Sequence, residues 1–280
     1  QLKDALREVE VDSTGAGSNI KEAQKDYIKA FPEVEVCIIS ACEHEFSHAA
    51  YQECGAAPYD LISIYERIKV AKQQNKKVIL SLHAGYELFE YPTPTLRREC
   101  HFFADAGADL IVCHHSHVAG AYEKFKNTNI YYGLGDLIFE GHHGNKPGEG
   151  YGVIAEWNTK LEMFDCSMVP YRQSPDLGGV QLLCDNALED FLSRQALHNS
   201  RLINGDWIKQ WDNFVEILKP SLFARIFLPI KFPGIARLMK VPLLRKLILG
   251  TNSMDKLNLL RCESLRAALI RSIESEHNND

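Results

Sequence analysis

The chain has 280 residues, of which 45% are hydrophobic, and a formal net charge of -6 at pH 7. This length suits one large globular domain or one domain with an appendage, and the acidic balance gives no global case for nucleic-acid binding. No apolar run is long enough to span a bilayer, and the eight cysteines form no CxxC pair, which favours a reducing compartment.

The first part of the chain alternates helical and strand-like segments. Helical spacing occurs at 18–31, 59–77 and 94–107, and short apolar runs rich in β-forming residues occur at 34–41, 78–82 and 108–113. Gly107 is placed to close the third helix. The alternation predicts a largely parallel sheet covered by helices, with functional sites in the loops beyond the carboxyl ends of the strands.

The character of the sequence changes after Gly120. β-like runs separated by Gly, Asn and Pro occur at 129–140, 150–158, 161–172 and 178–184. They predict a second, antiparallel sheet that packs on the first. From about residue 185 the pattern is helical, and a last helix is expected at 262–276. We therefore expect one domain at 1–184 and a helical C-terminal region at 185–280.

Four histidines follow two of the predicted buried strands. His83 ends one strand, and His114, His115 and His117 follow the next. If the strands are neighbours, the imidazoles meet at one sheet edge, where His115 and His117 project to the same side and could bind one or two metal ions. The alternative is that some of these rings only bond to backbone carbonyls. Histidines in predicted helices are interpreted as structural: His101, His198 and His277.

Carboxylates reach the same layer of loops. Glu43 and Glu45 follow the strand at 34–41, and Glu87 follows His83 by four residues. These side chains and His114 are candidates for acid, base or ligand-orienting roles. For Glu43 and Glu45, an exposed loop charge is an equally good interpretation.

Five segments together resemble a known family. They are GAGSNIKEA (15–23), EHEF (43–46), HAGYE (83–87), FFADAGADLIVCHHSHVAGAYE (102–123) and NIYYGLGDLIFE (129–140). In this order they are similar to the motifs of the CapA family, which comprises bacterial capsule and poly-γ-glutamate synthesis proteins related to calcineurin-like metallophosphatases. The resemblance implies an α/β fold, namely a metallophosphatase-like two-sheet sandwich flanked by helices, here with a helical C-terminal extension.

The resemblance also implies a two-metal centre that holds Mn, Fe or Zn, with His83, His115 and His117 as ligands. Two positions depart from the pattern: Cys113 stands where metallophosphatases usually have Gly, and Asp136 stands where the family usually has Asn. The family's early metal-binding segments would precede residue 15, so we expect the N-terminal part of the family domain to be missing, and a leader is not excluded. We accordingly expect this chain alone to bind metal poorly and to turn over no phosphoester, because imidazoles without a bridging carboxylate leave such a site incompletely neutralised.

These observations predict a metal-dependent hydrolase of capsule, poly-γ-glutamate or exopolysaccharide biosynthesis, acting on an anionic polymer or a phosphorylated glycan. The alternative is a non-catalytic assembly or export factor for a surface polymer that retains the fold; a further alternative is that the helical tail acts as an interaction module.

The region 220–250 contains six Lys or Arg and no acidic residue among many apolar ones. This composition suits contact with a membrane surface, or packing on the domain or on a partner protein. We therefore expect a cytoplasmic protein or one peripheral at the inner membrane surface, and we expect no nucleic-acid partner.

Overall fold

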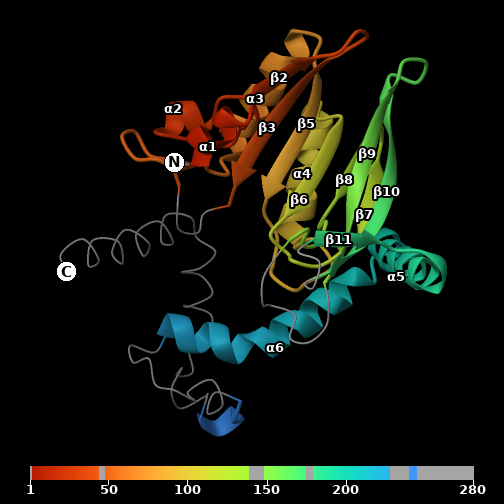
Figure 1. Ribbon diagram of the computed structural model, residues 1–280. Coiled ribbons are helices and arrows are strands. Elements are labelled where there is room, and N and C mark those ends of the chain that lie inside the picture. The colour runs from red at the N-terminus through yellow and green to blue at the C-terminus, as the bar shows by residue number, and fades with distance from the viewer. Residues whose placement is uncertain (1, 44–47, 139–147, 175–178, 228–239, 245–280) are drawn as a thin grey trace. The chain divides into compact units, whose positions relative to one another are not determined.

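The computed structural model of the protein describes residues 2–43, 48–138, 148–174, 179–227 and 240–244 (Figure 1). The chain divides into two compact units, Gln1–Trp211 and Asp212–Asp280. The three sheets of the described residues all belong to the first unit, so the description below concerns that unit.

A six-stranded sheet forms the centre of the first unit, in the order β2-β3-β5-β6-β8-β7. Its strands are β2 (Tyr27–Ala30), β3 (Glu35–Cys42), β5 (Lys77–His83), β6 (Leu110–His114), β7 (Tyr122–Phe125) and β8 (Thr128–Tyr131). The four inner strands run parallel, and β2 and β7 pair antiparallel at the two edges. The sheet is therefore mixed, with a parallel centre as the helix and strand alternation predicts.

Two helices, α3 (Leu61–Gln73) and α4 (Pro94–Ala106), cover one face of this sheet (Figure 1). Each begins at a side-chain cap, because Asp60 and Thr93 accept a hydrogen bond from a backbone N–H of the first turn. Gly107 ends α4 with a φ of 121°, which a residue with a Cβ rarely adopts. The predicted helix at 94–107 is thus confirmed, including its terminator.

The other face of the large sheet packs against a three-stranded antiparallel sheet of β9 (Glu149–Asn158), β10 (Met163–Ser174) and β11 (Gly179–Leu182). Helix α5 (Asp185–Asn204) contributes Phe191 to the same core. The buried residues of this core are Val36, Leu110, Tyr131, Tyr151, Phe164, Leu183 and Phe191. Two packed sheets with flanking helices confirm the predicted α/β sandwich.

Two expectations about local structure are wrong. The helix predicted at 18–31 is only the short α2 (Ile20–Ala23), and the following residues form β2. Pairing of β2 with β3 outweighs the local helical spacing, since it satisfies backbone groups at the sheet edge. The run at 129–140, which was assigned to the second sheet, places β8 beside β6 in the large one, where Ile130 is fully buried.

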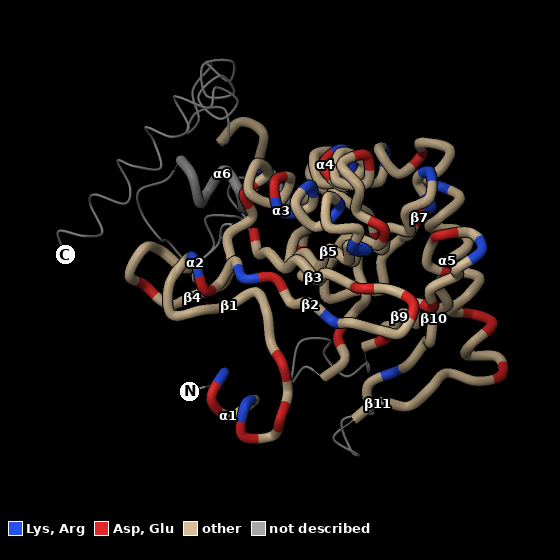
Figure 2. Tube along the Cα trace, turned by 90° about the horizontal axis from the view of Figure 1, so that it is seen from above, with Lys and Arg blue, Asp and Glu red and all other residues tan. Residues whose placement is uncertain are grey.

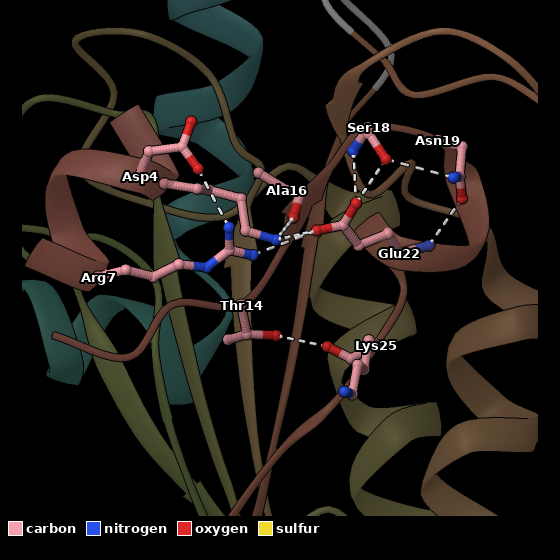
Figure 3. Close-up of polar contacts among 9 residues, drawn as sticks. Asp4, Arg7, Thr14, Ala16, Ser18, Asn19, Glu22 and Lys25 are labelled. Carbon is pink, nitrogen blue, oxygen red and sulfur yellow. Dashed lines mark hydrogen bonds and ion pairs between the residues drawn. The ribbon is translucent and has the colours of Figure 1, made fainter. Parts of the chain in front are cut away.

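Close to the N-terminus, α1 (Leu2–Glu8) is tied to α2 by one carboxylate (Figure 3). Glu22 accepts hydrogen bonds from Lys3 Nζ at 2.7 Å and from the backbone N–H and hydroxyl of Ser18 at 3.0 and 2.6 Å. Asn19 caps α2 by accepting the N–H of Glu22 at 3.0 Å. The hydrogen bonds from Lys3 and Ser18 lower the pKa of Glu22 to about 2. A two-stranded sheet of β1 (Ala16–Gly17) and β4 (Gly55–Ala56) completes this region.

Helix α6 (Trp207–Phe227) begins in the first unit and continues into the second. Of the helices that the structure describes, none combines the length and the apolar character needed to cross a bilayer. Acidic and basic residues are interspersed along the described chain (Figure 2). The helix expected at 262–276 and most of the basic region 220–250 lie outside the described residues.

Candidate functional site

The carboxyl ends of three neighbouring parallel strands meet at one sheet edge. Cys42 at the end of β3 stands opposite His83 at the end of β5, and His83 stands opposite His114 at the end of β6. The backbone N–H of Glu43 then donates a hydrogen bond to the carbonyl of His83 at 2.9 Å. The loops that carry the candidate residues therefore start side by side, in the position where open α/β sheets place their ligands.

Glu43, His115 and His83 form a continuous polar chain at this edge. His115 Nδ1 lies 3.0 Å from His83 Nε2, with the ring centroids 4.8 Å apart. On the other side of the ring, His115 Nε2 lies 3.3 Å from Oε1 of Glu43. Because a carboxylate only accepts hydrogen bonds, Glu43 favours the proton on Nε2 and leaves the lone pair of Nδ1 facing His83.

His117 is held by a second carboxylate. Its Nδ1 lies 2.7 Å from Oδ1 of Asp136, and its ring centroid lies 6.2 Å from that of His115. When Asp136 accepts the Nδ1 proton, Nε2 carries the lone pair; carboxylates commonly orient metal-binding histidines in this way. In the sequence, Asp136 stands out only as a departure from a motif. Its position soon after β8, the neighbour of β6, is the signal that could have identified it.

The loops of the site have an unusual backbone. His115 and His117 have φ values of 89° and 59°, and Leu88 in the facing loop has 58°. Non-glycine residues rarely adopt this region, and such strain is concentrated at functional sites. The N–H of Leu88 donates to the carbonyl of Ser116 at 2.8 Å, and the buried Ser116 hydroxyl donates to the carbonyl of Val118 at 3.2 Å. These bonds fix the loop that carries the two histidine rings.

The remaining predicted residues have less defined positions in the cluster. His114 is the last residue of β6, and burial lowers the pKa of its ring, so the ring is neutral near pH 7. Glu87 is exposed in the loop after β5. Glu45 lies outside the described residues. The catalytic roles expected for these three residues stay predictions.

The donor set fits a metal ion in part. Two nitrogens bound to one ion at about 2.0–2.1 Å lie roughly 3 Å apart, close to the 3.0 Å between His83 Nε2 and His115 Nδ1. Glu43 contacts the opposite nitrogen of His115 and is therefore placed to orient that ring. Among the residues that the structure describes, no group of three or more His, Cys, Asp or Glu side chains is arranged to hold a metal ion. The geometry therefore fits two imidazole ligands, His83 and His115. The carboxylates of Glu43 and Asp136 contact histidine nitrogens that do not face this pair.

A two-sheet α/β sandwich with clustered histidines at the carboxyl ends of adjacent strands is consistent with a metallophosphatase-like protein. A sequence profile of the family "Bacterial capsule synthesis protein PGA_cap" matches residues 1–141. The chain belongs to this family, as the five motifs indicate.

Two curated relatives each match about half of the chain. The chain is 28% identical over 142 residues to the capsule biosynthesis protein CapA of Bacillus anthracis. This match covers 49% of the chain and 34% of that protein. The chain is 30% identical over 147 residues to the PGA biosynthesis protein CapA of Bacillus subtilis (strain 168). This match covers 50% of the chain and 38% of that protein. The matched part of the chain therefore spans little more than a third of either relative.

Proposed function

We propose that this chain takes part in the synthesis of a bacterial capsule or of poly-γ-glutamate, and that its site performs metal-dependent hydrolysis. The names of the two relatives support the first statement. The proposed hydrolysis rests on the contacts that join Glu43, His115 and His83. In this row of side chains, a carboxylate directs the lone pair of one imidazole toward a second imidazole. The substrate we propose is an anionic polymer or a phosphorylated glycan.

His83 and His115 would hold a divalent Mn, Fe or Zn ion, which when bound supplies Lewis acidity and an activated water. We propose His117 as the third ligand, through the Nε2 lone pair that remains when Asp136 accepts the Nδ1 proton. Glu43 orients the ring of His115, and Asp136 orients the ring of His117 toward the same sheet edge. The expectation that the chain alone would bind metal poorly and be inactive rests on the lack of a bridging carboxylate, and Glu43 and Asp136 contact histidine nitrogens instead. Weak binding therefore stays a prediction. Because the two carboxylates orient the rings, we propose that saturating metal compensates for weak binding and allows turnover.

The test is hydrolysis of bis-p-nitrophenyl phosphate at millimolar Mn²⁺, a concentration that compensates for weak affinity. We expect metal-dependent turnover that falls by about a hundredfold or more in His115→Ala, because the substitution removes a ligand. His198→Gln, which alters a histidine outside the cluster, should retain turnover. Equal rates for His115→Ala and the unaltered chain would contradict the proposal.

The second candidate function is a non-catalytic assembly or export factor. The observation that favours it is the small number of facing ligands. Within the described residues, two histidine nitrogens face one another, and no group of three or more metal-binding side chains is found. This function predicts that Mn²⁺ binds at His83 and His115 while the phosphodiester stays intact. Metal binding without turnover, with the same dependence on His115, would select it over the hydrolase.

A further inference from the structure

A cavity of about 630 Å³ lies directly beside His117, and helix α5 forms part of its wall. This volume is within the range of about 300–1,000 Å³ that small-molecule sites usually have. Arg194, Gln195 and His198 of α5 line the cavity. The residues of α5 lie beyond residues 1–141, which the family profile matches, so this wall is a part of the chain that the family match does not describe.

One buried acceptor in this wall lacks a donor. Gln195 is 4% exposed, and its side-chain N–H donates to the carbonyl of Ala119 at 3.1 Å. That bond fixes the amide group, whose Oε1 is buried and has no hydrogen-bond partner in the described part of the chain. A buried acceptor without a donor is costly, so a ligand that donates an O–H or N–H to Oε1 would be stabilised here.

Two guanidinium groups supply donors at another part of the wall. Arg172 donates from Nε to Oε1 of Glu149 at 3.1 Å, and Arg194 donates to the other oxygen of the same carboxylate. One carboxylate therefore holds both groups in fixed positions. Each guanidinium carries five N–H donors, more than its bonds to Glu149 use, so the pair is suited to donate to oxygen atoms of a ligand.

The formal charges of the acidic and basic residues that line the described cavity cancel. Arg172 and Arg194 contribute two positive charges, and Glu149 and Glu90 contribute two negative ones. Burial lowers the pKa of His198, so its ring is neutral near pH 7 and adds no charge. The cavity therefore gives a charged ligand no net attraction, whereas a neutral ligand loses less hydration energy on entering it.

The lining groups together suit a neutral ligand that both donates and accepts hydrogen bonds at several points. Gln195 Oε1 and the carboxylate of Glu90 need donors, whereas the guanidinium groups need acceptors. A hydroxyl group meets both demands, because its O–H donates and its oxygen carries two lone pairs. A compound with several hydroxyl groups and no charge is therefore the chemical class that this wall fits best.

We propose that the cavity binds an uncharged sugar unit, whose hydroxyls donate to Gln195 Oε1 and Glu90 and accept hydrogen bonds from Arg172 and Arg194. Because the cavity adjoins His117, a phosphate attached to that sugar would lie toward the histidine cluster. This inference rests on the proposed function and narrows its substrate to a phosphorylated glycan, with the cavity as the subsite for the sugar. Binding of the sugar itself requires neither metal nor phosphate.

The test is a saturation-transfer NMR titration of the 280-residue chain with D-glucose, D-galactose and D-mannose in the presence of EDTA. The absence of metal and phosphate keeps a failure of the proposed hydrolysis from affecting the result. Glucuronate, galacturonate and mannuronate, in which a carboxylate replaces the C6 hydroxymethyl group, are the matched charged probes. We expect saturable binding of at least one sugar, and no tighter binding of its uronate.

Arg194→Gln is the principal variant, because the side chain is 51% exposed and its replacement should leave the fold intact. Its affinity for the bound sugar should fall about tenfold, since a hydrogen bond from a charged donor is lost. The control Lys209→Gln, which removes a positive charge from an exposed side chain of α6, should bind normally. Gln195→Met should weaken binding similarly to Arg194→Gln, with a thermal melt to verify folding.

Three results would overturn the proposal. The first is that none of the three sugars binds saturably, and the second is that the uronate binds more tightly than its sugar. The third is equal affinity for the sugar in Arg194→Gln and the unaltered chain.

Discussion

At the scale of single residues, the carboxylates determine which nitrogen each histidine offers. We predict that Asp136→Asn lowers the affinity for Mn²⁺ by about tenfold or more, because a neutral amide accepts the Nδ1 proton of His117 less strongly than a carboxylate does. Electron paramagnetic resonance of free Mn²⁺ measures the affinity. Asp165→Asn, an exposed carboxylate on β10, is the control. Unchanged affinity in Asp136→Asn would show that Asp136 has no orienting role.

A second prediction at this scale concerns how the Glu22 carboxylate makes the stability of the fold depend on pH (Figure 3). Because the pKa of Glu22 is lowered from 4.5 to about 2, its ionised form stabilises the fold above about pH 4.5, and this contribution is lost as the pH falls toward 2. Glu22→Gln should therefore lower the melting temperature at pH 7, and by less at pH 3.5. Glu8→Gln at an exposed position of α1 is the control. A melting-temperature difference that does not shrink on acidification would refute this assignment.

The sequence located the histidines of the site better than their partners. Strand endings identify His83 and His115, because a buried run followed by imidazole is visible in one dimension. The contact of Glu43 with His115 depends on the pairing of β3 with β5, which periodicity does not reveal. Asp136 likewise depends on the pairing of β6 with β8. The sequence therefore leaves open, or does not reveal, those contacts of the site that depend on which strands pair and in which register.

At the scale of elements, the segment that follows β8 comes so close to the histidine loop at Gly133 that this position requires glycine. A Cβ at Gly133 would lie 2.3 Å from the Ser116 hydroxyl and 2.9 Å from the carbonyl of Val118. We predict that Gly133→Ala lowers the free energy of unfolding by about 1–3 kcal/mol, as overpacking generally does. Urea denaturation measures this loss. For Gly152→Ala the nearest atom lies at 4.0 Å, so this control in β9 should be close to neutral. Equal stabilities of the two variants would contradict the packing argument.

Sequence patterns predicted those elements whose local and tertiary preferences agree. The strand β5, the helix α4 and the strand β6 are of this kind, because buried apolar runs and a glycine terminator specify them locally. The edge strand β2 is different: its residues suit a helix by spacing, and pairing with β3 decides the outcome. Tertiary contacts also decide to which sheet β8 belongs, because a short apolar run fits either sheet.

At the scale of the whole molecule, we propose that the basic region 220–250 contacts membrane surfaces. Apolar side chains would enter the headgroup boundary while cations meet anionic lipid. The intact chain should cosediment with anionic liposomes at low salt and less so with neutral ones, whereas a chain ending at Lys219 should stay in the supernatant. Equal recovery of both chains in the supernatant with anionic lipid would leave packing of this region on the protein or on a partner as its role.

The most direct test of the metal site is X-ray absorption spectroscopy of the chain loaded with one equivalent of Zn²⁺. We predict imidazole scattering from two or more nitrogens at about 2.0 Å, reduced in His83→Ala and in His115→Ala but unchanged in His198→Gln. That result would place the ion between the nitrogens that lie 3.0 Å apart at the ends of β5 and β6. Imidazole scattering that persists undiminished in both variants, or zinc surrounded only by oxygen in the unaltered chain, would contradict the account.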